Sequence, residues 1–270
     1  MTAVDAFGLT DVGRMRERNE DHFVVASMRK SVTVRYSSLT EADLATRIAG
    51  AEAFLFAVAD GVGGRPGGEL ASSAVVTGLM GYVGRAAGCY HQFNFNEEHQ
   101  FLERLEQSIR DAHEELIRAH GDTDKAPATT LTLAMLVGLR AYLVHVGDTR
   151  AYYLHGSRLR QITRDQTIGE FMMDQGAWTE TQAAKSAAGK ALASAIGGSE
   201  LTPSVGLIDL APGDTLLLCS DGLNKHVPDQ DIAAILGQPI GAEAATRELV
   251  ARALSGGGTD NITAIVARIS

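Results

Sequence analysis

The sequence predicts an α+β sandwich, and three observations support that fold class. Candidate strands and helices occur in runs and do not alternate strictly, which disfavours a doubly wound parallel sheet. Successive apolar strands are joined by short turns at Gly138 and Gly156, which favours antiparallel pairing. The chain has 270 residues, of which 45% are hydrophobic and 21% charged, so a full core is available and wholesale disorder is excluded.

The expected strands are short apolar runs bounded by turn residues. Residues 54–59 are continuously apolar, as in a buried strand, and residues 151–162 are typical of a hairpin that turns at Gly156. The expected strands span residues 22–25, 54–59, 131–137, 142–146, 151–154, 158–162, 215–219 and 262–269.

Four helices are expected between these strands. Apolar residues from Phe101 to Leu116 recur at spacings of three and four, which is typical of an amphipathic surface helix. Residues 71–83 are small and follow a glycine-rich loop, a third helix begins near Pro228, and residues 243–254 precede three glycines that end a helix.

The net charge and the cysteine content argue against several classes of protein. A net charge of −9 disfavours binding to nucleic acid or to a membrane surface, because an acidic surface repels phosphate backbones and anionic lipid. Two cysteines, Cys89 and Cys219, exclude a disulfide framework and a cysteine-based zinc site. Because no apolar run is long enough to cross a bilayer or to form a signal peptide, we expect a cytoplasmic protein.

Five aspartates lie at the boundaries of the expected strands. Asp60, Asp148 and Asp221 follow strands, whereas Asp21 and Asp260 precede them. In an antiparallel sheet the end of one strand lies beside the start of the next, so all five can gather at one edge. Any one of them alone is more typical of a turn. Clustered carboxylates repel each other unless a cation neutralises them, and oxygen ligands without cysteine or histidine suit Mg²⁺ or Mn²⁺.

Six short motifs lie along the chain, and five of them contain these aspartates. They are Arg16-Glu17-Arg18-Asn19-Glu20-Asp21, Asp60-Gly61-Val62-Gly63-Gly64, Ala128-Thr129-Thr130-Leu131, Val146-Gly147-Asp148-Thr149-Arg150, Ser220-Asp221-Gly222-Leu223 and Thr259-Asp260-Asn261-Ile262-Thr263. Together they resemble the metal-dependent serine/threonine protein phosphatases of the 2C family, and most closely its small bacterial members. Each motif alone is a weak signal, but six in the family's order, in a resemblance that runs from about Gly8 to Val266, are a strong one. The resemblance implies a four-layer α-β-β-α sandwich, with two antiparallel sheets face to face, helices outside and a binuclear metal site at one end.

The resemblance also implies how the acids divide between two Mn²⁺ or Mg²⁺ ions. Asp60 would bridge both ions, the Gly61 carbonyl and Asp21 would complete one site, and Asp221 and Asp260 would hold the other. Two divalent ions about 3.5–4 Å apart acidify a shared water, which then attacks phosphorus in line without a phosphoenzyme.

Three further positions carry implied roles. Glu20 would act on a metal through water, and Asp148 would join Asp221 in the family's weaker third metal site. Arg16 would bind the substrate phosphate, because its planar fork grips two phosphoryl oxygens in a way that lysine cannot copy. The alternative for Arg16 is a solvated charge beside Arg14 and Arg18.

One motif departs from the family pattern. Some members carry a histidine two residues after the bridging aspartate, as a proposed proton donor to the leaving alcohol. Val62 occupies this position here, so a metal-bound water would have to serve.

Residues 1–270 are expected to be one catalytic domain with two additions. Residues 31–52 form a probable insertion, which is either a surface excursion or a docking element for a kinase or regulator. Residues 167–190 would form a mobile flap beside the active site. Phe171–Met173 and Trp178 are expected to pack within this flap, and the alternative is that they contact a partner. Asp165, just before the flap, is expected to be structural.

The implied function is hydrolysis of phosphoserine and phosphothreonine in proteins by a monomer that reverses a bacterial protein kinase. One alternative is a catalytically silent module that keeps the fold for signalling or binding, which the complete set of metal acids disfavours. Another is a different two-metal phosphoesterase such as a nuclease, which the acidic charge and the absence of a basic, aromatic groove disfavour.

Overall fold

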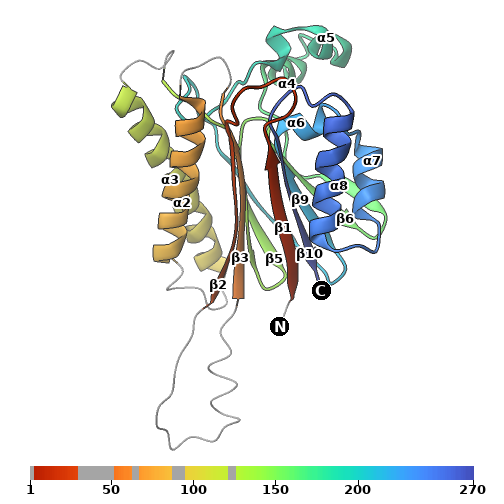
Figure 1. Ribbon diagram of the computed structural model, residues 1–270. Coiled ribbons are helices and arrows are strands. Elements are labelled where there is room, and N and C mark those ends of the chain that lie inside the picture. Colours follow the sequence, from red (N-terminus) through yellow and green to blue (C-terminus); the bar gives the residue numbers. More distant parts are fainter. Residues whose placement is uncertain (1–2, 30–51, 63–66, 87–94, 121–125) are drawn as a thin grey trace, which may run out of the picture.

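The chain folds as two five-stranded sheets that pack face to face, with helices on the outer faces (Figure 1). The computed structural model describes residues 3–29, 52–62, 67–86, 95–120 and 126–270. All strand pairs are antiparallel. The predicted four-layer α+β sandwich is therefore confirmed.

Each sheet is assembled from strands that lie far apart in the sequence. The first sheet has the order β1-β10-β9-β6-β7, with β1 Val4–Asp11, β10 Ile262–Ile269, β9 Thr215–Cys219, β6 Arg150–His155 and β7 Arg158–Gln161. The second has the order β2-β3-β4-β5-β8, with β2 Asp21–Arg29, β3 Glu52–Asp60, β4 Leu131–Val137, β5 Arg140–Val146 and β8 Ser204–Asp209.

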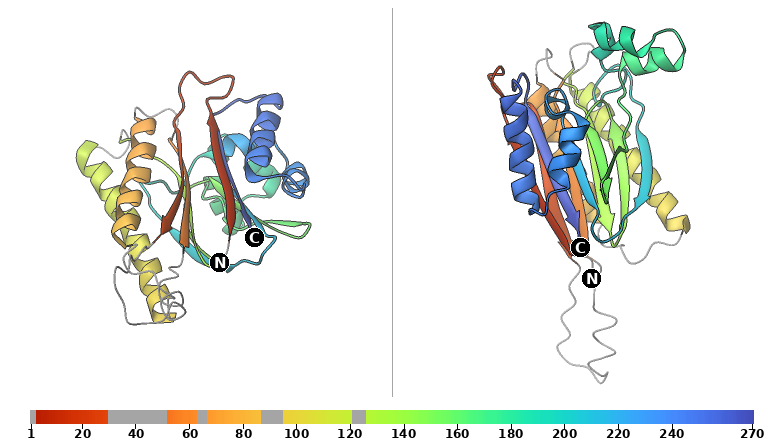
Figure 2. Two further views of the ribbon diagram at one scale, coloured as in Figure 1. Left: turned by 60° about the horizontal axis from the view of Figure 1, so that its bottom comes forward. Right: turned by 90° about the vertical axis from the view of Figure 1, so that its right-hand side faces the viewer.

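The helices form three groups (Figures 1 and 2). The second sheet is covered by α2 Gly68–Ala86 and α3 Phe95–His120, and the first by α6 Asp221–Asn224, α7 Asp229–Leu236 and α8 Ala242–Ser255. The third group, α4 Ile168–Asp174, α5 Glu180–Lys185 and the 3₁₀ helix η2 Ala188–Lys190, lies at one end of the sandwich.

Three apolar layers explain why the central strands are continuously apolar. Neighbouring residues on a strand face opposite sides, so Leu55 packs toward α2 and α3 while Phe56 packs between the sheets. In the same way, Leu216 packs between the sheets and Leu217 toward α7 and α8. Both faces of these strands are buried, although the sheets are antiparallel.

The predicted strands are all present, and β9 and β10 coincide with residues 215–219 and 262–269. The strands β1 and β8, which lie at sheet edges and are only partly buried, were not predicted from the sequence. No helix was predicted for residues 167–190, which carry α4, α5 and η2. The probable insertion at 31–52 lies outside the described residues except for Glu52, the first residue of β3.

The layer between the sheets should dominate stability. Replacing Leu216→Ala, at 0% exposure, should lower the free energy of unfolding by about 2–5 kcal/mol, because it leaves a cavity in a close-packed layer. The matched control Leu207→Ala, at 44% exposure on β8, should lower it by less than about 1 kcal/mol. Urea unfolding measures both values, and equal losses would contradict this account of the core.

Candidate active site

Strand pairing brings the predicted acids to one end of the sandwich. Asp21 and Asp60 are register partners at the ends of β2 and β3. A cavity of about 390 Å³ opens at this end. It is lined by every predicted site residue except Asp21, namely Arg16, Glu20, Asp60, Gly61, Asp148, Asp221 and Asp260.

Asp21 lies just beneath this cavity with an incomplete set of partners. Its side chain is buried, and its Oδ2 accepts hydrogen bonds from Ser220 Oγ at 2.7 Å and Thr263 Oγ1 at 2.6 Å. Its Oδ1 is also buried but has no hydrogen-bond partner, and the same holds for Asp221 Oδ1. Buried oxygens without partners are costly, so these two atoms are suited to a bound cation.

The clustered carboxylates resist full ionisation. Burial, reinforced by the charges of Asp21 and Asp221, raises the pKa of Asp60 well above its usual value. Burial likewise raises the pKa of Asp21 to about 6 and that of Asp148 to about 7. These groups share one cause: each negative charge leaves water and faces others of the same sign.

Two basic side chains offset part of this negative charge. Arg16 Nε lies 2.7 Å from Asp260 Oδ1, and Lys225 Nζ lies 2.5 Å from Asp221 Oδ2 and 2.9 Å from Asp260 Oδ2. Burial alone would raise the pKa of Asp260, but hydrogen bonds from Arg16 and Lys225 outweigh it and lower that pKa. Partial burial disfavours the Lys225 ammonium, yet its two carboxylate partners raise its pKa overall.

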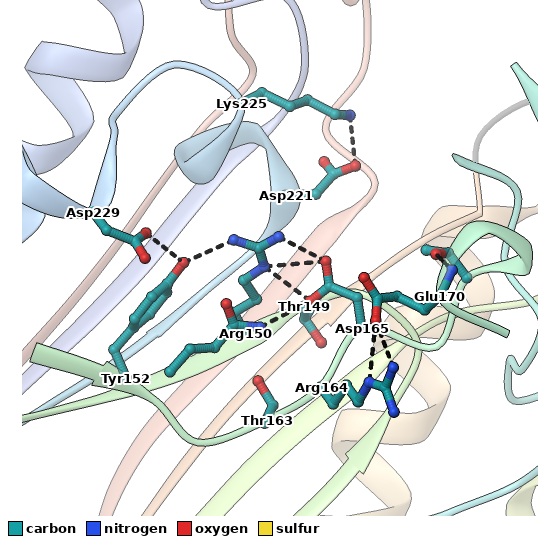
Figure 3. A network of polar contacts seen from close by, with 12 residues as sticks. Thr149, Arg150, Tyr152, Thr163, Arg164, Asp165, Glu170, Asp221, Lys225 and Asp229 are labelled. Atoms are coloured by element: carbon teal, nitrogen blue, oxygen red, sulfur yellow. Dashed lines mark hydrogen bonds and ion pairs between the residues drawn. The ribbon is translucent and has the colours of Figure 1, made fainter. Parts of the chain in front are cut away.

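The acids share a cavity but do not form a ready metal cage. Among the residues that the structure describes, no group of three or more acidic, histidine or cysteine side chains has the proximity that holds a metal ion. Asp221 and Asp260 point instead to the basic side chains, and Figure 3 shows the bond from Lys225 to Asp221.

Two glycines allow the loops of this end to approach closely. A Cβ atom on Gly61 would lie 2.5 Å from the backbone of Gly68, and one on Gly222 would lie 1.9 Å from the Asn261 carbonyl oxygen. Any larger residue would therefore push apart the segments that carry Asp60 and Asp221.

Asn261 ties the connection between β1 and β2 to the segment before β10 at the cavity. Its Oδ1 accepts a hydrogen bond from the Glu20 backbone at 2.8 Å, while its Nδ2 donates to the carbonyls of Val12 and Arg18. Asn261 lies within one of the six motifs, but no role was predicted for it from the sequence. Lys225 was missed too, although an acid and a base four residues apart on a helix was an available signal.

Beside the acids, α4, α5 and η2 border a second cavity of about 390 Å³, which Asp148, Asp221 and Lys225 also line. In the lining of this cavity, Arg150 binds both oxygens of Asp165 and donates to the Tyr152 hydroxyl at 2.9 Å (Figure 3). Asp165 thus has the structural role expected of it.

The apolar residues of 167–190 differ from expectation at one position. Phe171 is 57% exposed, so the expected packing role is wrong for this residue. Met172, Met173 and Trp178 are half-buried. Gly169 is the one fully buried residue of α4.

No helix among the described residues combines the length and apolar character needed to span a bilayer. Cys219 is a buried free thiol. Cys89 lies outside the described residues.

Comparisons with known proteins agree on one family. A family model described as protein phosphatase 2C matches residues 37–256. The serine/threonine protein phosphatase PstP of Mycobacterium tuberculosis is 36% identical over 222 residues, which cover 81% of this chain and 41% of that protein. This chain therefore spans about two fifths of the length of PstP. Protein phosphatase PhpP of Streptococcus pneumoniae is 28% identical, with 94% of this chain and 93% of that protein covered.

Solved structures give the same result. The S. agalactiae serine/threonine phosphatase has a TM-score of 0.77 and 25% identity, with all of both chains covered. The catalytic domain of PstP in complex with two manganese ions has a TM-score of 0.74 and 28% identity, with 100% of this chain and 99% of that chain covered.

The raised pKa of Asp60 predicts how pH acts on the metal-free protein. A carboxyl group with a raised pKa binds its proton more tightly in the folded than in the unfolded chain, so its contribution to stability falls as pH rises above the unfolded-state pKa of about 4. In EDTA, Asp60→Asn should therefore raise the melting temperature at pH 7.5 by about 2–4 °C, which corresponds to about 1 kcal/mol.

The gain should shrink when the same melting curves are recorded at pH 5. Asp111→Asn removes an exposed acid of α3 whose partner, Gln107, can also bond an amide, and it should have little effect at either pH. A gain that is equal at both pH values would argue against carboxylate repulsion as its cause.

Proposed function

This chain belongs to the protein phosphatase 2C family, and we propose that it hydrolyses phosphoserine and phosphothreonine in proteins in a metal-dependent reaction. The observation that carries the proposal is the convergence of acids from distant segments on one cavity, where two buried carboxylate oxygens have no hydrogen-bond partner. That arrangement suits a site completed by cations.

The side chains fit two divalent ions. The donors are all oxygen atoms, which suit Mn²⁺ and Mg²⁺. We assign Asp21, Asp60 and the Gly61 carbonyl to one ion, and Asp60, Asp221 and Asp260 to the other. When bound, two such ions supply Lewis acidity that makes water nucleophilic near neutral pH and a template for the phosphoryl oxygens.

Two more acids belong to the same assignment. Glu20 would hold water at the ions, and its position is fixed by the hydrogen bond from its backbone N–H to Asn261. Asp148 would share a third ion with Asp221, since both line the two adjoining cavities.

Arg16 would bind the phosphate of the substrate. Its side chain is 44% exposed and lines the cavity, so it can reach a ligand from solvent. Two of its nitrogens bind the two oxygens of Asp260, and two phosphoryl oxygens of a substrate can take the place of these carboxylate oxygens. Val62, which lines the same cavity, has no proton to give, so a water held at the metal centre would protonate the leaving alcohol.

The wider setting is part of the proposal. Residues 1–270 would act as one catalytic domain, with residues 167–190 as a flap that borders the second cavity. The substrates would be phosphorylated proteins in the cytoplasm of a bacterium, and a serine/threonine kinase would be the partner in signalling. We expect a monomer that uses Mn²⁺ or Mg²⁺. The relatives named above are bacterial protein phosphatases, which supports the proposed substrate class.

A direct test is hydrolysis of a phosphothreonine peptide and of an aryl phosphate. We expect turnover with Mn²⁺, loss of turnover in EDTA, and a fall in kcat/KM of at least about 10³-fold in Asp60→Ala, because that residue would contact both ions. Asp111→Ala is the matched control and should retain activity. Activity that is indifferent to EDTA would rule out the metal-dependent reaction, and Mn²⁺ binding without turnover would favour a silent binding module.

Arg16 makes a separate prediction. Both Arg16→Ala and Arg16→Lys should raise KM for the aryl phosphate by about tenfold, because neither residue offers a planar fork to two oxygens. Arg14→Ala removes a neighbouring exposed arginine and should leave KM unchanged. Steady-state kinetics at saturating Mn²⁺ measure this, and unchanged kinetics in both Arg16 variants would remove the assigned role.

A further inference from the structure

Lys225 holds two acids that the proposed function assigns to a single ion. Its Nζ lies 2.5 Å from Asp221 Oδ2 and 2.9 Å from Asp260 Oδ2. The two carboxylates come from α6 and from the segment before β10, so one ammonium group joins distant parts of the chain. A single positive charge between these two carboxylates is the arrangement that a divalent ion would also require.

A backbone hydrogen bond fixes Lys225 next to Asp221. Its backbone N–H donates to the Asp221 carbonyl at 2.9 Å, so one helical turn places the lysine beside the aspartate. The side chain is 40% exposed, which gives it an open path to swing toward solvent when another cation takes its place.

The two proposed ion sites differ in what occupies their oxygen atoms. Asp21, assigned to the first ion, has only the neutral hydroxyls of Ser220 and Thr263 as partners and keeps Oδ1 without a partner. At the second ion, Asp260 has Oδ1 on Arg16 and Oδ2 on Lys225, and Asp221 has Oδ2 on Lys225 while its Oδ1 has no partner. A second ion must therefore displace charged partners, whereas the first meets none at Asp21.

We propose that Lys225 competes with the second divalent ion for the carboxylates of Asp221 and Asp260. This competition makes the chain bind the second ion more weakly than the first. The inference rests on the proposed function, because it requires the two-ion site. Its consequence is that the two ions load in order: the first at Asp21 and Asp60, and the second only when the metal concentration is high enough to displace the lysine.

Calorimetric titration of the whole chain with Mn²⁺ tests the proposal without reference to activity. The wild-type protein should show a tighter and a weaker site. Lys225→Met and Lys225→Gln remove the charge and should tighten the weaker site by about tenfold, while the tighter site changes by less than about twofold. Lys225→Arg keeps a competing charge and should stay within about threefold of wild type at the weaker site. Lys185→Met, at an exposed lysine of α5, is the matched control and should change neither.

The outcomes separate this inference from the proposed function. Two Mn²⁺ sites with the same weaker affinity in wild type, Lys225→Met and Lys225→Gln would overturn the role of Lys225 alone. A wild-type protein that binds no Mn²⁺ would overturn the metal centre and this inference with it. Unchanged Mn²⁺ binding together with a raised KM for an aryl phosphate would make Lys225 a phosphate-binding residue and not a competitor.

Discussion

Repulsion among carboxylates gathered at one end of the sandwich is the constraint on which the rest of this site depends. Burial and like charge raise the pKa of Asp60, Asp21 and Asp148. The neighbouring groups counter this repulsion with hydroxyl donors at Asp21 and with two cationic side chains at Asp260. The folded chain thus neutralises only part of the negative charge of these carboxylates, and bound divalent cations would neutralise the rest.

The sequence predicted the parts of the fold that burial alone determines. Strands with both faces in apolar layers, such as β3 and β9, are continuous apolar runs that any pattern analysis recognises. The edge strands β1 and β8 are not recognisable from the apolar pattern, because their residues are only partly buried and their pairing depends on partners far along the chain. Sheet order is likewise a tertiary property that no local pattern encodes.

For the candidate site, motif order predicted which acids share a cavity, but it did not predict what holds them. Asn261 acts through bonds to backbone groups of residues 12, 18 and 20, which come close only after folding. Lys225 could have been found from its spacing to Asp221, yet its second bond, to Asp260, depends on the tertiary fold.

The β2–β3 pair has a consequence for how this chain can vary. Asp21 and Asp60 face each other at one end of the pair, while Arg29 and Glu52 face each other at the other. Nine residues of strand separate the two ends, a span of roughly 30 Å. The connection between β2 and β3 therefore joins the sandwich at the pole remote from the acids. Its length and composition can diverge between homologues without disturbing the spacing of the two carboxylates.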